Sequence, residues 1–324
     1  MHNPNTSPMK KPLILLASAA TVLLSITACN KDDDHLGGPS PMPTSNSNLR
    51  DLFTDHIAQE TQNFTVNATL GGLVTGAAGT RVLFPANGFR DANGSVVSGT
   101  VQVQLLEALT IGRMIWINTQ TVGDDNGTDR LLRSGGEMRL TATQNGNALQ
   151  LGPGGVSVLM PTSNPDNNMR LFTANEPRDS GMVWTPADSS WVTLVEDTAF
   201  GGGISYAFQT DSLQWINCDY FYNYPSTTNI AAMIPAGQPA DSTMVWIGFP
   251  TENAVMNMFN SQDQVFTTWQ VVPVGMQATV VGLYRNGSQY SSAFSTVTIT
   301  DLMAVPLTFT PTTLAQFEQD IDGI

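Results

Sequence analysis

Histidine and lysine are confined to the beginning of this chain. They occur only at His2, Lys10, Lys11, Lys31, His35 and His56. A Ser-His-Asp triad, an imidazole metal centre, a lysine Schiff base and a Walker lysine each need one of these residue types. The residues after His56 therefore lack the side chains of several common enzyme classes. We expect a non-enzymatic protein that carries no cofactor.

Charge and cysteine are scarce as well. Only 12% of the 324 residues are charged, and the net charge is −14. This balance argues against nucleic acid and anionic lipid headgroups as partners, because both attract basic patches. The cysteines are Cys29 and Cys218. Aromatic and apolar neighbours predict that Cys218 is a buried structural cysteine rather than a reactive one.

The first 28 residues have the pattern of a secretory signal peptide. Lys10 and Lys11 supply its positive end, and residues 13–28 are apolar except for Ser and Thr. This stretch is too short and too rich in small residues for a comfortable membrane span. Cleavage after residue 28 makes Cys29 the first residue of the mature chain. The alternative is an ordinary secretory signal followed by an incidental cysteine.

The residues around the cleavage point resemble a known class of anchored proteins. The sequence Ile26-Thr27-Ala28-Cys29 is similar to the bacterial lipobox, in which the cysteine sulfur receives a diacylglyceryl group. The acidic run after it resembles the export signal of Bacteroidota surface lipoproteins and comprises Lys31, Asp32, Asp33 and Asp34. The resemblance implies lipid anchoring in the outer membrane and display on the cell surface. A solvated acidic spacer is the alternative interpretation of the run.

The rest of the chain predicts an all-β fold with short terminal helices. After the tether, the apolar residues of 49–60 follow a helical period, and the capping box at Thr313 predicts a second helix. Between them, alternating runs are separated by the turn signals Asn93-Gly94, Asn126-Gly127, Asn145-Gly146 and Asn286-Gly287. We expect two antiparallel β-sandwich domains, with the lipidated cysteine, tether and helix in 29–62, the first sandwich in 63–205 and the second in 206–324.

The start of the first sandwich resembles the ZU-type domain of ankyrins and netrin receptors. The resemblance rests on the glycine pair Gly71-Gly72 and on a second strand that ends at Pro85. Proline ends strand pairing because it lacks a backbone donor. The resemblance implies a β-sandwich and is nearly silent on activity. Family members that cleave themselves use a His-Phe-Ser site, which this part of the chain cannot provide.

Two groups of residues are candidate binding sites. Asp124, Asp125 and Asp129 place oxygen ligands in one loop that can hold calcium, with a solvated hairpin tip as the competing interpretation. The aromatic residues offer a platform for sugar rings, and they include Trp184, Trp191, Trp215, Tyr220, Phe221, Tyr222, Tyr224 and Trp269. The run Tyr220, Tyr222 and Tyr224 is the least core-like, because adjacent aromatics on a strand face both sides. These tyrosines are our candidate ligand contacts.

These observations leave three functions open. The first is a membrane-anchored structural or interaction module with a protein or glycan partner. The second is a surface lipoprotein that binds carbohydrate through the tyrosines. The third is a glycoside hydrolase that uses carboxylates alone, for which the candidate acids are Glu107, Glu137, Glu196 and Glu252.

Overall fold

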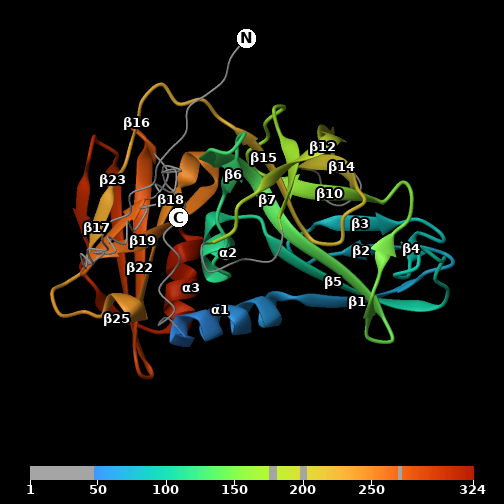
Figure 1. Ribbon diagram of the computed structural model, residues 1–324, viewed down its shortest axis with the longest axis horizontal. Helices are drawn as coiled ribbons and strands as arrows, with labels where there is room; N and C mark the ends of the chain where they lie inside the picture. The colour runs from blue at the N-terminus through green and yellow to red at the C-terminus, as the bar shows by residue number, and fades with distance from the viewer. Residues whose placement is uncertain (1–46, 175–180, 198–202, 269–271) are drawn as a thin grey trace, which may run out of the picture. The chain divides into compact units, whose positions relative to one another are not determined.

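The computed structural model describes residues 47–174, 181–197, 203–268 and 272–324 (Figure 1). The signal peptide, Cys29, the acidic run and Trp269 lie outside the described residues. The described chain consists mainly of antiparallel strands, with short helices near its two ends. The expected all-β class with terminal helices is confirmed.

The first half of the described chain is a β-sandwich. One sheet pairs its strands in the order β1 (Gln62–Asn67), β5 (Thr100–Ala108), β7 (Asp129–Gln144), β15 (Trp215–Phe221), β11 (Arg170–Ala174) and β12 (Thr185–Trp191). The facing sheet has the order β13 (Thr193–Glu196), β14 (Ile204–Thr210), β10 (Val156–Thr162), β3 (Arg81–Phe84) and β2 (Gly72–Thr75). The inner faces share one apolar cluster that includes Val103, Leu140, Val158 and Phe208. Alternation along each strand therefore buries one face, as the sequence predicts.

Short strands extend this sandwich at its edges. β6 (Val122–Asp124) and β8 (Asn147–Ala148) pair with β7, and β4 (Phe89–Arg90) pairs with β9 (Gln150–Leu151). Asn126 and Asn145 have positive φ values of 56° and 52°, and each is followed by a glycine that also has positive φ. These are the two Asn-Gly turns that join β6 to β7 and β7 to β8.

The second half is built on one continuous sheet. Its strand order is β24 (Ala304–Pro306), β17 (Ala231–Met233), β20 (Val265–Thr268), β19 (Ala254–Gln262), β18 (Thr243–Phe249), β22 (Gln277–Asn286), β23 (Gln289–Thr298) and β25 (Thr310–Thr312). The pair β17 and β24 is parallel, and the other pairs are antiparallel. A separate ribbon joins β16 (Thr227–Thr228) to β21 (Val272–Pro273). One face of the sheet encloses an apolar cluster that includes Val245, Ile247, Met256 and Val280.

The chain passes from the first sandwich to the second half of the protein later than the sequence predicts. The expected boundary at 205/206 assigns β15 to the second domain, yet β15 pairs with β7 and β11 of the first sandwich. The chain enters the second half between Phe221 and Thr227.

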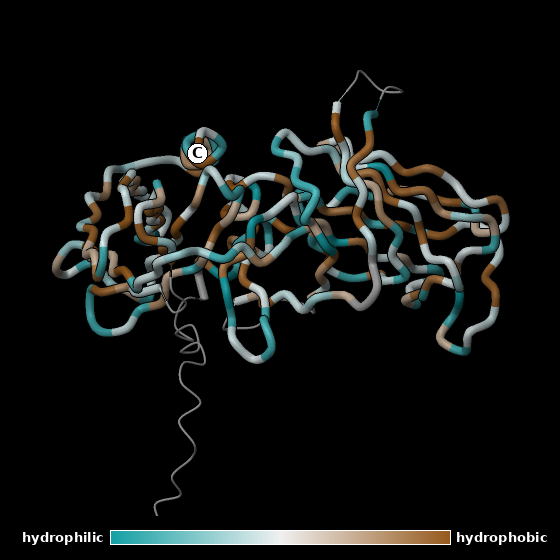
Figure 2. Tube along the Cα trace, turned by 90° about the horizontal axis from the view of Figure 1, so that it is seen from above, coloured by the Kyte–Doolittle hydropathy of each residue, from teal (hydrophilic) through white to brown (hydrophobic). Residues whose placement is uncertain are grey.

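A third apolar cluster joins the two halves through the helices. The helices are α1 (Ser47–Glu60), α2 (Ile111–Trp116) and α3 (Leu314–Asp322), and two short 3-10 helices are η2 (Ala240–Ser242) and η3 (Pro250–Glu252). Phe53 of α1 packs edge-on against Trp246 of β18, with ring centroids 5.7 Å apart. Trp246 in turn lies 6.5 Å from Phe317 of α3. In Figure 2 hydrophobic stretches run through the body of the molecule, whereas several projecting loops are hydrophilic.

The sequence signals at α3 and Cys218 are confirmed. The Thr313 side chain accepts a hydrogen bond from the Gln316 amide at 3.1 Å, so the capping residue was predicted correctly. Cys218 is fully buried and has no disulfide partner among the described residues. Burial raises the pKa of its thiol well above the usual value. A thiol in this state is unreactive.

Candidate ligand-binding site

The three candidate tyrosines lie side by side and form a tyrosine row. Tyr220 belongs to β15, and Tyr222 and Tyr224 follow the end of this strand with their rings next to one another. The ring centroids of Tyr220 and Tyr222 are 6.0 Å apart, and those of Tyr222 and Tyr224 are 4.8 Å apart. Tyr222 is 40% exposed, whereas its two neighbours are partly buried. The row therefore offers aromatic surface to solvent.

The opposite side of this segment is fixed to the protein. Phe221 packs edge-on against Phe172, with centroids 5.3 Å apart, and the Arg130 guanidinium lies 5.5 Å above the Phe221 ring. Arg130 also donates to the backbone oxygen of Tyr222 at 3.2 Å and to Oδ1 of Asn223 at 2.9 Å. These contacts hold the backbone that carries the row, so its geometry is set before any ligand binds.

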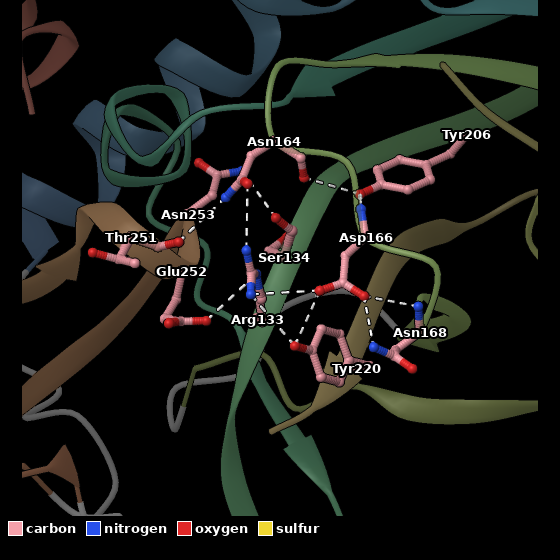
Figure 3. A network of polar contacts seen from close by, with 10 residues as sticks. All are labelled: Arg133, Ser134, Asn164, Asp166, Asn168, Tyr206, Tyr220, Thr251, Glu252 and Asn253. Carbon is pink, nitrogen blue, oxygen red and sulfur yellow. Dashed lines mark hydrogen bonds and ion pairs between the residues drawn. The ribbon is translucent and has the colours of Figure 1, made fainter. Parts of the chain in front are cut away.

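Arg133 of β7 lies next to the row, between two carboxylates (Figure 3). Its Nη1 is 3.5 Å from Oδ2 of Asp166, and its Nε is 3.5 Å from Oε2 of Glu252. Nη1 also donates to the Tyr220 hydroxyl at 3.5 Å, and Nη2 donates to Asn164 at 3.3 Å. The Tyr220 hydroxyl donates to Asp166 at 3.2 Å. We call Arg133, Asp166, Tyr220 and Glu252 the Arg133 cluster.

The Arg133 cluster is assembled from both halves of the protein. Asp166 comes from the loop between β10 and β11, whereas Glu252 belongs to η3 beside the second sheet. The Tyr206 hydroxyl accepts from the Asp166 amide at 2.9 Å and donates to the Asn164 carbonyl at 3.2 Å (Figure 3). Asn164 also donates to the Thr251 carbonyl at 3.2 Å. These bonds tie the loop to η3 and hold the carboxylates in place.

Three polar atoms in and beside the Arg133 cluster make no hydrogen bond to the described residues. The Tyr224 hydroxyl, Glu252 Oε2 and Arg133 Nε are buried atoms without a hydrogen-bond partner in the described part of the chain, although the last two attract each other across 3.5 Å. Burial raises the pKa of Glu252, and the positive charge of Arg133 opposes this only in part. Burial also raises the pKa of Tyr224. These three atoms are closed to solvent, so the polar atoms that a ligand can reach beside the aromatic row are those of exposed residues such as Asn223.

The acidic hairpin at the β6–β7 turn has a structural explanation. Asp124 Oδ1 accepts from the Gly127 amide at 2.5 Å, and Asp125 forms an ion pair with Arg130. Burial raises the pKa of Asp129, and the negative charge of Asp124 adds to this. Across the described ranges, no group of three or more His, Cys, Asp or Glu side chains is arranged to hold a metal ion. The calcium interpretation of Asp124, Asp125 and Asp129 therefore receives no support from the geometry.

The glutamates that a hydrolase would need have different surroundings. Glu107 accepts from the Gln62 side chain at 3.0 Å and from the amides of Ala78 and Thr80. Glu137 is fully buried, Glu196 is exposed at the end of β13, and Glu252 is paired with Arg133. Glu107 thus stabilises a loop. Two catalytic carboxylates must instead face each other across an accessible substrate site.

Other aromatic candidates divide into core and surface. Trp184 and Trp215 are buried and pack edge-on in the cluster between the halves. Trp191 is 79% exposed.

Arg133 and Asp166 were not predicted as site residues. An isolated charged residue on a strand and another in a loop carry no sequence signal that they meet in space.

Comparison with known proteins gives no family assignment. No protein-family model matches the chain, and no curated protein sequence matches it. None of the described helices has both the length and the hydrophobicity needed to cross a membrane. The resemblance to lipoproteins and to the ZU-type domain therefore remains a prediction from sequence.

Proposed function

We propose that this chain is a non-enzymatic, lipid-anchored lipoprotein of the outer membrane that is displayed at the cell surface and binds carbohydrate. The anchor is Cys29, and the export signal is the run from Lys31 to Asp34. The tether after them separates the folded body from the membrane. The folded body is an interaction module, and the tyrosine row supplies its ligand contacts.

The observation that carries the proposal is the tyrosine row beside the Arg133 cluster. Flat tyrosine rings pack against the apolar face of a sugar ring, while charged and amide groups bond its hydroxyls. Tyr222 supplies the exposed ring, Asn223 follows it in the chain, and Arg133 and Asp166 contact the neighbouring Tyr220. A purely structural role does not require aromatic surface to remain exposed next to unsatisfied buried polar groups.

A hydrolase is less well supported than a binding protein. Bond cleavage by carboxylates alone needs a general acid and a second carboxylate at a fixed separation across the substrate. Glu252 has a raised pKa, as a general acid requires, but its side chain pairs with Arg133 and is only 7% exposed. We therefore assign Glu252 to holding Arg133 rather than to proton transfer.

Glycan-array binding tests the proposed ligand class. The full-length chain in detergent should bind a subset of neutral or weakly charged glycans, and Tyr222→Ala should reduce the signal about tenfold, which corresponds to about 1.4 kcal/mol. Tyr222→Phe keeps the ring and should keep most of the binding. Leu302→Ala, at a position that is 77% exposed, is the control. Equal signals from the wild type and Tyr222→Ala would show that the row is not the contact.

Protease treatment of intact cells tests the anchoring and display. Wild-type protein should be cleaved from whole cells, whereas a variant with Ala at 31–34 should be protected. Cys29→Ser should release the protein from the membrane fraction, because it removes the acyl chains. Protection of the wild type would place the body in the periplasm and contradict surface display.

A further inference from the structure

An exposed tryptophan lies beside the outer face of the sandwich sheet that contains β10 and β14. Trp191 lies at the end of β12, where the chain passes to β13, and 79% of its surface is exposed. The other described tryptophans, Trp116, Trp184, Trp215 and Trp246, are at most 6% exposed. A large ring left in water costs hydrophobic free energy, so an exposed tryptophan of this kind commonly marks a contact surface.

A groove lies beside Trp191 on this sheet face. It has a volume of about 530 Å³, and its floor comes from β10 and β14. The floor side chains form two cross-strand pairs, because Leu159 lies opposite Ala207 and Ser157 lies opposite Gln209. Residues that lie opposite each other on paired strands share one face of the sheet. All four side chains therefore lie on the solvent-facing side. The groove thus combines an aromatic wall with a hydroxyl and an amide.

The surface continues across two further strands. Leu83 of β3 lies opposite Ser157, and Leu73 of β2 lies opposite Leu83. These leucines are 52% and 54% exposed. The row from Gln209 to Leu73 therefore crosses four strands, about 14 Å at the usual strand spacing. It is long enough for more than one sugar ring.

The charges in and around the groove define the ligand class. None of the side chains that line the groove is charged. Two charged residues lie opposite groove residues in the strand register. Arg81 lies opposite Leu159 and is already paired with Asp197, and Arg170 lies opposite Trp191 and donates to the carbonyls of Asn168 and Met169. Because the whole chain has a net charge of −14, an acidic polymer or a second copy of the chain would be repelled. A neutral polymer would not be repelled by this charge.

We infer that this Trp191 groove is a second binding site, separate from the tyrosine row, for a neutral polysaccharide whose sugar ring stacks on Trp191. The Ser157 hydroxyl and the Gln209 amide bond the hydroxyls of the same sugar unit. Leu83 and Leu73 contact the apolar face of the neighbouring unit. The inference shares its ligand class with the proposed function but rests on different residues.

Affinity electrophoresis of the full-length chain in detergent tests this site. The gels contain xylan, mannan or a mixed-linkage β-glucan as neutral probes, and polygalacturonate as the acidic probe. At least one neutral polymer should retard the wild type. Trp191→Ala should weaken this retardation about tenfold, and Trp191→Phe should weaken it less. Equal retardation of the wild type and Trp191→Ala, retardation by polygalacturonate alone, or retardation by no polymer overturns the inference.

The matched variant separates this inference from the proposed function. Retardation that is lost in Trp191→Ala and kept in Tyr222→Ala supports the groove alone, whereas the reverse result supports only the tyrosine row. Acrylamide quenching gives a second readout that does not depend on polymer migration. The emission that Trp191→Phe removes should be readily quenched in the free protein and protected by the bound polymer. Unchanged quenching at saturating polymer contradicts stacking on Trp191.

Discussion

The imidazole ring of His56 is stacked on the indole ring of Trp116. The ring centroids are 3.6 Å apart, the planes differ by 11°, and His56 Nδ1 donates to the Trp116 carbonyl oxygen at 2.8 Å. This contact fastens α1 to α2 next to the apolar cluster that joins the two halves. Burial lowers the pKa of His56, outweighing the bond to Trp116 and the negative charges of Glu318, Glu60 and Asp55.

The lowered pKa of His56 predicts a loss of stability in mild acid. Its folded pKa lies below the unfolded value, so the unfolded chain binds more protons once the pH falls below about 6.5. The free energy of unfolding should decrease there, by at most about 1.4 kcal/mol per pH unit from this group. His56→Phe keeps a ring but cannot titrate. Urea unfolding at pH 7.5 and 5.5 should show that the advantage of the wild type over His56→Phe shrinks at the lower pH.

Glu137 and Asp219 form a buried acidic pair that should respond to pH in the opposite direction. Both are fully buried on neighbouring strands, and burial raises the pKa of each well above its usual value. The charge of Asp219 raises the pKa of Glu137 further. The folded chain therefore holds more protons than the unfolded chain above about pH 4, and stability from this pair falls as the pH rises.

The isosteric variant Glu137→Gln isolates this effect. It replaces a carboxyl by an amide that cannot titrate, so it should gain stability relative to the wild type between pH 5 and pH 8. Thermal unfolding of both proteins across this range measures the change. Met138→Leu, a substitution of an adjacent residue that faces the sandwich core, is the control and should show no pH-dependent difference. A constant difference between Glu137→Gln and the wild type would mean that Glu137 is ionised throughout.

Asn253 should contribute to the joint between the halves through both its backbone and its side chain. Its φ is 46°, and its Nδ2 donates to the carbonyls of Leu109 at 3.0 Å and Ser134 at 3.3 Å. Glycine at position 253 can adopt the positive φ, but Asn253→Gly loses both side-chain hydrogen bonds, which should cost about 1–3 kcal/mol of stability. Asn253→Ala should cost a further 1–2 kcal/mol or so, because its Cβ disfavours positive φ.

Equilibrium unfolding in guanidinium ranks these variants. Asn126→Gly is the control, because Asn126 also has positive φ but lies in an exposed hairpin. Its effect should stay within about 0.5 kcal/mol. If Asn253→Gly is as stable as the wild type, the two hydrogen bonds do not hold the halves together.

Gly112 permits the close approach of α2 and α3. A Cβ at this position would lie 2.6 Å from Asp322 Oδ1 and 2.8 Å from the Ile321 carbonyl oxygen. Gly112→Ala must therefore separate the helices and disturb the ion pair of Arg113 with Asp322, with an expected cost of about 1–3 kcal/mol. Gly72→Ala is the control, since its Cβ would make an ordinary contact 3.4 Å from Val66. Calorimetric melting should show a lower Tm for Gly112→Ala alone.

Local signals in the sequence predicted local structure well. The Asn126-Gly127 turn, the Thr313 cap and the alternation of strands such as β5 depend on residues close together in the chain, and all occur as expected. Such patterns are readable because the backbone geometry that produces them spans only a few residues.

Long-range pairing could not be read from the sequence. The position of β15 in the first sandwich depends on its register with β7, and nothing in the residues of β15 specifies that partner. The Arg133 cluster likewise joins Arg133 to Asp166 and Glu252, which are distant in the chain. The sequence did not reveal the third apolar cluster. An apolar residue that packs against the other half of the protein has the same sequence pattern as one that packs within its own half.

Titration calorimetry measures whether the tyrosine row binds a sugar. The full-length chain in detergent is titrated with the soluble oligosaccharide that gives the strongest array signal. We expect saturable binding, an affinity within about threefold for Tyr222→Phe, and a loss of about tenfold for Tyr222→Ala. Identical affinities for the wild type and Tyr222→Ala, or cleavage of the oligosaccharide during the titration, would contradict the proposed function.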